Sequence, residues 1–535
     1  MPNNYKGLNI TGLKSTTKLS RVQVEPTIDF VEITDRGSIS ENPSKLRTAG
    51  AGHQKRSNAS PKSAIGTSID MGGLWEPASE YDYGIVSADT FVISENSRWS
   101  ARRKLMNPPA GPAVVTVDWS SATLAYTLDN PNAYDTSVGD LFGCALEIDG
   151  DFAIVGAYGE DDAADVGTYG SGKAYIFNVT TGTLVHTLDN PNPWGDTQYD
   201  SFGRSVAISG DYAIVGAHNE DHAVVPNSPT GAGDDAGKAY IFNVTSGLLV
   251  HTLNNPKPYT PRSQNGGDRF GWVVAISGDY AIVSAHRESD QSGKAYIYNV
   301  TTGALVHTLD NPNPYSGTYQ DEFGYSAAIS GDYAIVGAYA EDDDDGTSSG
   351  KAYIFNVTSG LLVHTLDNPN PFGTSTDDYF GRSVAISGDH AIVGAVREDD
   401  GGGAAGKAYI YNVTSGLLVH TLDNPNAYSS PASDLFGDSV AISGDYAIVG
   451  AFGEGDDDAT WGSGKAYIFN VTTGLPVYTL DNPNPYGTSS DDRFSWGMEG
   501  NRGVSISGGH AMVGARQEDD LGGTSSGKAY IFQVV

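Results

Sequence analysis

Short apolar segments recur along this chain in a fixed order, separated by polar links rich in Gly, Asp, Asn and Ser. The clearest copy occupies residues 380–424 and reads FGRSVAISGDHAIVGAVREDDGGGAAGKAYIYNVTSGLLVHTLDN. Its four apolar segments, 380–387, 390–395, 407–413 and 418–422, have the length and the Val, Ile and Tyr content of β-strands, and no long stretch with a 3.6-residue period competes with them. The pattern predicts four strands in each copy.

Two of the links carry turn signals. A Gly-Asp step, Gly388-Asp389 in this copy, joins the first and second strands, and it favours a tight hairpin turn of the primed class. The sequence NVTTG or NVTSG joins the third and fourth strands, with Gly at the position that needs a positive φ. The remaining two links are longer and vary between copies, so we expect them to lie together on the opposite face.

The Gly-Lys step that opens the third segment marks the repeat. It occurs seven times, at intervals of 56 to 65 residues, with lysines at Lys173, Lys238, Lys294, Lys351, Lys407, Lys465 and Lys528. Four-stranded units repeated radially form a β-propeller. We therefore predict an all-β fold, a seven-bladed β-propeller.

The two ends of the repeat region predict how the ring closes. The seventh copy stops at KAYIFQVV and lacks its fourth strand, whereas TLAYTLDNPN at 123–132 matches TLVHTLDNPN at 183–192. We expect this N-terminal strand to complete the last blade, so that no strand edge is left open. The predicted domains are an extended, largely irregular arm at 1–112, with room for a small β segment at 84–93, and a propeller at 113–535.

The pairing of Phe202-Gly203 with Gly216-Ala217, repeated in each unit, resembles the FG-GAP repeats of integrin-α-type seven-bladed propellers. The resemblance covers residues 123–535 and implies an adhesive or ligand-binding fold. The Pro that follows Gly-Ala in that motif is absent, and a Gly-Asp turn replaces the DxDxDG calcium loop, so the resemblance implies no calcium site of that design. The repeated DNPNPYGTS-type links are similar to those of aquatic phage and bacterial surface proteins.

Charge divides the chain into two parts. Residues 1–112 hold 14 Lys and Arg against 11 Asp and Glu, a net charge of +3, whereas the remainder holds 17 against 54, a net charge of −37. Such a ring repels nucleic acid. The first sixty residues are too polar to order themselves alone, so we predict that the arm docks to other proteins. The basic candidates for docking are Lys45, Arg47, Lys55, Arg56, Arg102, Arg103 and Lys104.

Acidic residues recur in the longer links, after each Gly-Ala and before each Phe-Gly. One interpretation is that their oxygens bind Ca²⁺. The alternative is structural: the Asp before Phe-Gly caps a turn, and the Glu after Gly-Ala pairs with the Gly-Lys lysine. The metal candidates are Asp342, Asp343, Asp344, Asp345, Glu398, Asp399, Asp400, Glu160, Asp161 and Asp162.

Several other features narrow the function. Cys144 is the single cysteine, so no internal disulfide forms. No apolar run is long enough to span a membrane, and the N-terminus lacks the apolar segment of a secretory signal. Histidines recur on the fourth strands, but Tyr126 and Tyr478 replace them in two copies, so packing explains the position better than metal binding. We expect no catalytic residues.

Three function classes follow. The first is a non-enzymatic virion surface protein, an appendage, fibre or decoration component of a tailed phage, docked by its arm to other virion proteins. Its acidic ring would then present the longer links to a host-surface glycan or protein. The second is a bacterial cell-surface or secreted adhesin. The third is a propeller glycosidase or lyase, for which only the irregular segment 494–507 breaks the repeat enough to supply a site. That segment is either such a site or the seam of the ring.

Overall fold

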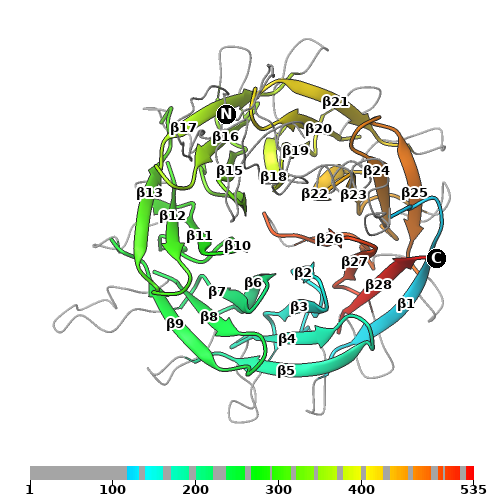
Figure 1. Ribbon diagram of the computed structural model, residues 1–535, viewed down its shortest axis with the longest axis horizontal. Helices are drawn as coiled ribbons and strands as arrows, with labels where there is room; N and C mark the ends of the chain where they lie inside the picture. Colours follow the sequence, from blue (N-terminus) through cyan, green and yellow to red (C-terminus); the bar gives the residue numbers. More distant parts are fainter. Residues whose placement is uncertain are drawn as a thin grey trace, which may run out of the picture. The chain divides into compact units, whose positions relative to one another are not determined.

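The repeated strands assemble into a seven-bladed propeller (Figure 1). The computed structural model describes residues 117–131, 139–160, 170–191, 200–220, 236–258, 267–288, 292–314, 321–342, 348–369, 378–398, 405–425, 434–455, 462–483, 492–497, 500–518 and 526–535. Within these residues, twenty-eight strands form seven antiparallel sheets of four strands each. The all-β, seven-bladed fold expected from the repeats is confirmed.

Each blade uses its four segments in chain order. The first strands are β2 (Leu146–Asp149), β6 (Phe202–Ser209), β10 (Val274–Ser277), β14 (Ser326–Ser330), β18 (Phe380–Ser387), β22 (Phe436–Ser443) and β26 (Val504–Ser507). The second strands are β3 (Phe152–Ala157), β7 (Tyr212–Ala217), β11 (Tyr280–Ala285), β15 (Tyr333–Ala338), β19 (His390–Ala395), β23 (Tyr446–Ala451) and β27 (His510–Ala515).

The outer half of each blade follows the same rule. The third strands are β4 (Lys173–Asn178), β8 (Lys238–Asn243), β12 (Lys294–Asn299), β16 (Lys351–Asn356), β20 (Lys407–Asn412), β24 (Lys465–Asn470) and β28 (Lys528–Val534). The fourth strands are β5 (Thr183–Asp189), β9 (Leu249–Asn254), β13 (Leu305–Asp310), β17 (Leu362–Asp367), β21 (Leu418–Asp423), β25 (Pro476–Asp481) and, for the seventh blade, β1 (Ala122–Asp129). Blades are numbered 1 to 7 from β2.

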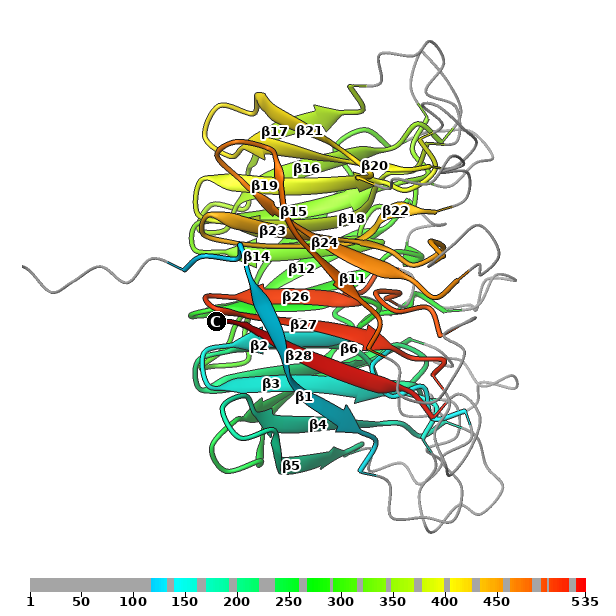
Figure 2. The same cartoon turned by 90° about the vertical axis from the view of Figure 1, so that its right-hand side faces the viewer.

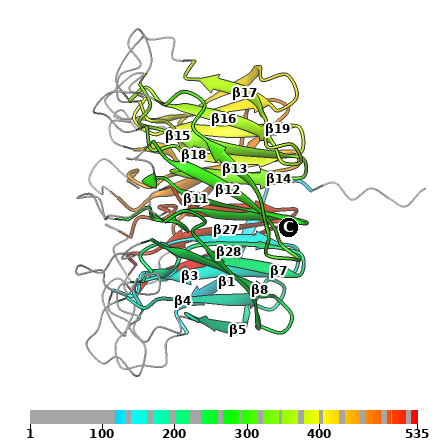
Figure 3. The same cartoon turned by 90° about the vertical axis from the view of Figure 1, so that its left-hand side faces the viewer.

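The first strands lie nearest the centre of the ring and the fourth strands form its rim (Figure 1). The two side views show that all strands run across the thickness of the ring (Figures 2 and 3). One face, here called the turn face, carries the Gly-Asp and NVT-Gly turns. The other, the link face, is where the first and third strands begin and the second and fourth end. This arrangement brings the start of every first strand to the axis on the link face.

The turns have the predicted geometry. Ser387 pairs with His390 across the Gly388-Asp389 turn, and Gly388 has φ +55°. In the NVTSG turn of the same blade, Gly416 has φ +71°, and the Asn412 Oδ1 accepts hydrogen bonds from the Ser415 backbone N–H and hydroxyl. Asn and Gly in this motif are therefore explained by turn chemistry.

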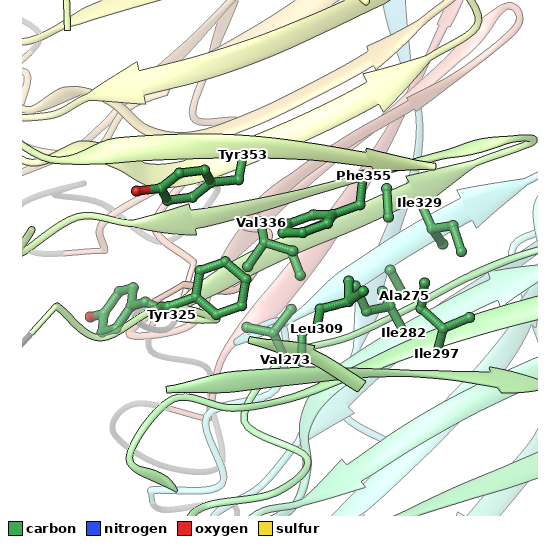
Figure 4. Close-up of a cluster of buried hydrophobic side chains, with 14 of the residues drawn as sticks. Val273, Ala275, Ile282, Ile297, Leu309, Tyr325, Ile329, Val336, Tyr353 and Phe355 are labelled. Carbon is green, nitrogen blue, oxygen red and sulfur yellow. The ribbon is translucent and has the colours of Figure 1, made fainter. Parts of the chain in front are cut away.

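The hydrophobic core lies between neighbouring blades rather than within one sheet. Between blades 3 and 4, Ile282 and Ile297 of one sheet pack against Val336 and Phe355 of the next, all 4% exposed or less (Figure 4). Because each sheet buries both faces this way, its central strands are continuous apolar runs. Equivalent clusters join other adjacent blades.

Ring closure occurs as the sequence predicts. β1 pairs antiparallel with β28, with Thr127 opposite Tyr530, and Lys528 Nζ lies 2.6 Å from Asp129 Oδ1. Just before β1, the fully buried Trp119 donates from Nε1 to the carbonyl of Gly508 in a turn of blade 7, at 3.4 Å. Trp119 therefore lies on the turn face.

The chain divides into two units, 1–116 and 117–535. The predicted docking arm at 1–112 lies outside the described residues and stays a prediction. Within the described residues, no helix has the length and apolarity needed to cross a membrane.

Candidate functional site

The Phe-Gly and Gly-Ala steps explain how neighbouring blades interlock on the link face. A Cβ on Gly216 would lie 2.2 Å from the carbonyl oxygen of Gly271 in the next blade, so blade 2 has no room for a side chain at this position. The equivalent residue in blade 3 is Ser284. The Ser205 hydroxyl donates to the same Gly271 carbonyl, at 2.9 Å. Blades 4 and 5 repeat the contact through Ser326 and Gly381.

In blades 2, 5 and 6 the same step interrupts the pairing of the first strand with the second. The register of β6 with β7 jumps from Phe202 opposite Ala217 to Ser205 opposite Gly216. Gly203, at φ +89°, and Arg204 therefore bulge from the ladder. Bulges of this kind re-aim a side chain, and the Arg204 guanidinium here lies over the Trp272 ring of the next blade.

The glutamate after each Gly-Ala is buried against its own blade. In all seven blades it accepts a hydrogen bond of 2.5 to 2.8 Å from the tyrosine hydroxyl of the third strand, and it is 2% exposed or less. The pairs are Glu160–Tyr175, Glu220–Tyr240, Glu288–Tyr296, Glu341–Tyr353, Glu398–Tyr409, Glu454–Tyr467 and Glu518–Tyr530. The tyrosine partner was not expected from the sequence.

Burial changes the acidity of these glutamates. It raises the pKa of Glu160 to about 8 and the pKa values of Glu288, Glu341, Glu454 and Glu518 to about 7, because the charged form loses its hydration. Near neutral pH these carboxyls therefore carry a proton for much of the time, which makes them weak ligands for a cation.

The aspartate before each Phe-Gly is also a structural group. Its Oδ2 accepts a hydrogen bond of 2.8 to 3.0 Å from the side chain of the Asn that directly follows the fourth strand of the preceding blade. This bond closes the link between the two blades. The pairs are Asn130–Asp140, Asn190–Asp200, Asn255–Asp268, Asn311–Asp321, Asn368–Asp378, Asn424–Asp434 and Asn482–Asp492.

The Gly-Lys lysine pairs with the fourth strand. Lys173 Nζ lies 2.7 Å from Asp189, and five other blades repeat this ion pair. Blade 2 has Asn254 in place of the Asp, and there Lys238 contacts Glu220 at 2.7 Å instead. The Lys–Glu pair that the sequence predicts is therefore found in blade 2, where Asn254 replaces the usual Asp partner.

These contacts locate some of the metal candidates. Glu160 and Glu398 are among the buried Tyr-bonded glutamates, and Asp342 accepts from the backbone N–H of Ser348 at 2.8 Å. Within the described ranges, no group of three or more Asp, Glu, His or Cys side chains is placed to hold a metal ion. The other candidates lie outside those ranges, so Ca²⁺ binding there stays a prediction: Asp161, Asp162, Asp343, Asp344, Asp345, Asp399 and Asp400. The docking candidates Lys45, Arg47, Lys55, Arg56, Arg102, Arg103 and Lys104 also lie outside them.

The blades differ most at four positions around the axis, here called the axial positions. They are the residue before Phe-Gly, the residue after it, and the two residues after Gly-Ala. In blades 1 to 4 they hold Leu141, Cys144, Tyr158 and Gly159; Ser201, Arg204, His218 and Asn219; Arg269, Trp272, His286 and Arg287; and Glu322, Tyr325, Tyr339 and Ala340. In blades 5 to 7 they hold Tyr379, Arg382, Val396 and Arg397; Leu435, Asp438, Phe452 and Gly453; and Arg493, Trp496, Arg516 and Gln517.

Trp272 is the centre of one group of axial side chains. The Arg204 guanidinium lies 3.5 Å from the centroid of its ring, and the His286 ring lies 4.1 Å away centroid to centroid. His218 packs edge-on against the same indole, and Tyr325 lies 5.7 Å away. In Figure 4, Tyr325 points its hydroxyl toward the same end of the blades as Tyr353.

Trp496 is the centre of a second group. The Arg516 guanidinium lies 3.5 Å from its ring centroid, Arg493 lies 4.5 Å away, and Phe452 stacks on it at 4.9 Å. Between the two groups, Tyr339 contacts Tyr379 and Arg382 pairs with Asp438 at 2.8 Å. Axial side chains therefore join blade to blade from blade 2 to blade 7.

Residues 500–503, part of the irregular segment 494–507, contact blades on several sides of the axis. The Asn501 side chain donates to the carbonyl of Trp272 in blade 3, at 3.3 Å, and the Leu146 backbone N–H of blade 1 donates to the Arg502 carbonyl. The Gly503 N–H donates to Ser439 Oγ of blade 6, and Arg502 pairs with Glu147. Figure 1 shows the chain entering β26 from the middle of the ring. Residues 501–503 thus connect blade 7 to blades 1, 3 and 6.

The electrostatics of the Trp272 group are set by arginine. Burial lowers the pKa values of His218 and His286 well below the usual range, and the nearby Arg204, Arg269 and Arg287 lower them further. Both imidazoles are therefore neutral at pH 7, and the 3.9 Å approach of His286 to Glu322 is not an ion pair. Cys144 is fully buried at its axial position, and burial raises the pKa of its thiol.

Sequence reasoning did not identify the axial groups, because the residues come from six blades and are separated by hundreds of positions. The signal was nevertheless present: the Phe-Gly and Gly-Ala steps each recur in six of the seven copies, and Ser495 and Ser284 are the exceptions. The neighbouring positions that change from copy to copy are the ones that the fold does not fix.

Comparison with known families agrees with the repeat. A model described as FG-GAP repeat matches seven segments, which together make up more than half of the chain: 132–177, 196–242, 260–298, 314–355, 373–411, 428–469 and 486–532. We find no curated protein that matches the chain.

Proposed function

Because the chain belongs to the FG-GAP repeat family, whose propeller fits a surface or adhesion-type protein, we propose that it is a non-enzymatic surface protein of a tailed-phage particle. The arm at 1–112 docks it to other virion proteins, and the ring meets a glycan or protein of the host surface. The repeated links similar to those of phage and aquatic bacterial surface proteins support this choice.

One structural observation carries the proposal. The arm joins the ring at Val117, and the Trp119 that follows is fixed to the turn face by its bond to Gly508. The axial positions are at the opposite end of the strands, on the link face. A ring attached through its turn face would leave the axial side chains directed away from the particle.

Charge supports the same division of roles. The arm has a net charge of +3, and the rest of the chain −37. An acidic ring keeps copies of itself apart in solution, while a basic arm is attracted to acidic partners.

A binding role fits the axial side chains better than an enzymatic one. Arginines and aromatic rings predominate there, and the carboxylates at these positions are Glu322 and Asp438. Asp438 already pairs with Arg382. Glycoside hydrolysis requires two carboxyl groups facing one bond, and these two come from blades 4 and 6.

The test is deletion of residues 1–60 in particles produced in the host. We expect the truncated protein to keep the thermal unfolding transition of the intact ring but to be missing from purified particles. A matched variant with Lys45, Arg47, Lys55 and Arg56 changed to Gln separates the contribution of charge from that of length.

Truncated protein that still co-purifies with particles would contradict the docking role. Intact protein found on bacterial cells that carry no phage would favour the alternative, a cell-surface or secreted adhesin.

A further inference from the structure

We infer that residues 117–122 form a tension-bearing anchor, which holds the closing strand β1 on blade 7 when the arm is pulled away from the turn face. The anchor transfers the load to blades 6 and 7 before it reaches β1. This inference goes beyond the proposed function, because it concerns a property of the isolated chain and does not depend on what the arm binds.

Blade 7 differs from the other blades in how its fourth strand is attached. In blades 1 to 6, an NVT-Gly turn joins the third strand covalently to the fourth. In blade 7 the two strands come from opposite ends of the ring, β1 before blade 1 and β28 after β27, so no such turn joins them. β1 is therefore held on β28 by noncovalent contacts, and a pull on the arm acts directly on these contacts.

The direction of β1 decides how a pull acts on it. β1 runs from the turn face, where Ala122 lies opposite Val534, to the link face, where Asp129 lies opposite Lys528 (Figure 2). The arm joins the ring at Val117 on the turn face. A pull directed away from that face therefore acts along β1 and loads its hydrogen bonds to β28 together, in shear. Contacts made before β1 begins are loaded first.

Trp119 supplies the apolar part of the anchor. Its side chain is fully buried in the hydrophobic cluster between blades 6 and 7, which includes Ile448 of β23 and Val513 of β27. The indole Nε1 also donates to the carbonyl of Gly508, at 3.4 Å. Trp119 is among the largest fully buried side chains of the ring, so its extraction into water is strongly unfavourable.

Two tyrosine hydroxyls of blade 6 hold the backbone on either side of Trp119. Tyr446 donates to the carbonyl of Val117, at 3.1 Å, and Tyr478 donates to the carbonyl of Ala122, at 3.0 Å. The segment that precedes β1 is therefore fixed to the neighbouring blade as well as to blade 7. A load on the arm is shared between two blades.

The repeat shows that these groups are not needed to build a blade. The residue equivalent to Tyr446 is Phe152 in blade 1 and His390 in blade 5, and neither carries a hydroxyl. The turn that receives Trp119 departs from the repeat, because Gly509 stands where the other six blades have Asp. The Tyr446 hydroxyl and this altered turn both lie where residues 117–122 enter the ring, which fits a role in holding the arm.

The experiment uses the purified full-length chain, held between optical traps at constant force. One handle is attached at the N-terminus and the other at a cysteine introduced by Thr421→Cys, an exposed position in β21 of blade 5. Cys144 is buried and does not compete for the handle. The lifetime of the closed ring under load is recorded, because forced unfolding reports the unfolding rate.

We expect Trp119→Ala to shorten this lifetime at least about tenfold, since it removes the buried indole. Tyr446→Phe removes one hydrogen bond and should shorten the lifetime about threefold. Trp119→Phe keeps an aromatic ring in the cluster and should fall between Trp119→Ala and the unaltered chain, which provides a second reading where the alanine variant folds poorly.

Tyr333→Phe is the matched control. Tyr333 is the residue of blade 4 equivalent to Tyr446, and blade 4 is separated from blade 6 by a whole blade. We expect this variant to keep the lifetime of the unaltered chain.

If both Trp119 variants open at the same rate as the unaltered chain, residues 117–122 carry no load and the inference fails. It also fails if Tyr333→Phe shortens the lifetime as much as Tyr446→Phe, because the effect is then a general loss of stability. Both outcomes are separate from the docking proposal, which the deletion of residues 1–60 tests in particles.

Discussion

At the scale of single residues, most of the acidity that suggests a cation-binding ring has a structural explanation in the described residues. The Asp before Phe-Gly closes a link through Asn, and the Glu after Gly-Ala lies buried against Tyr. Sequence patterns could show that these positions recur in every blade. They could not show which partner each carboxyl meets, because Tyr467 and Glu454 are brought together only when the strand and the link fold.

The buried glutamates predict an unusual pH dependence. The pKa values of five of them, about 7 to 8, lie above the ordinary 4.5, so folding takes up protons; these five are Glu160, Glu288, Glu341, Glu454 and Glu518. The stabilisation is complete below about pH 4.5 and is lost as the pH rises through 7 to 8. A pKa that is one pH unit higher in the folded than in the unfolded chain corresponds to about 1.4 kcal/mol. We expect the free energy of unfolding, measured with urea, to fall between pH 5 and pH 8.

Repulsion among ionised carboxylates also lowers the free energy of unfolding as the pH rises, so the two effects must be separated. The variant Glu454→Gln does this. Gln keeps the hydrogen bond from Tyr467 and cannot titrate. The variant should lose about one proton of uptake, so its free energy of unfolding should depend less steeply on pH. An unchanged slope would show that Glu454 is ionised in the folded ring.

At the scale of strands and blades, the fold could be predicted almost completely. Seven copies of one sequence pattern specify the strands, their order and the strand that closes the ring, because the sheet of every blade must bury the same two faces. The axial groups could not be predicted, because Trp272 and Arg204 become neighbours only through the packing of two blades and the bulge at Gly203.

The closing strand gives an element-scale prediction. Leu128 in β1 is 2% exposed and packs in the core, whereas Leu124 in the same strand is 42% exposed. We expect Leu128→Ala to lower the free energy of unfolding by about 2–5 kcal/mol, and Leu124→Ala by less than about 0.5 kcal/mol. Urea denaturation checks both. Equal, small effects would mean that β1 adds little to the stability of the last blade.

At the scale of the whole molecule, the ring combines an acidic exterior with an arginine-rich axis. Repulsion among its 54 acidic residues should be relieved by divalent cations gathered in the links, including Asp342 to Asp345. We expect excess chelator to lower the melting temperature modestly at constant ionic strength. Replacing these four aspartates with Asn should reduce the difference. An identical melt with and without chelator would leave the links as ordinary solvated surface.

The pairing of β1 with β28 also has a consequence for synthesis. The strand that completes the ring leaves the ribosome early, but its partner follows 399 residues later, as the Asp129–Lys528 contact shows. At about 5–20 residues per second, β1 waits on the order of 20 to 80 seconds with an unpaired edge. During that interval, a second chain translated from the same mRNA could pair one of its own exposed strand edges with β1. Translation speed should therefore influence how much of this protein reaches a closed, monomeric ring.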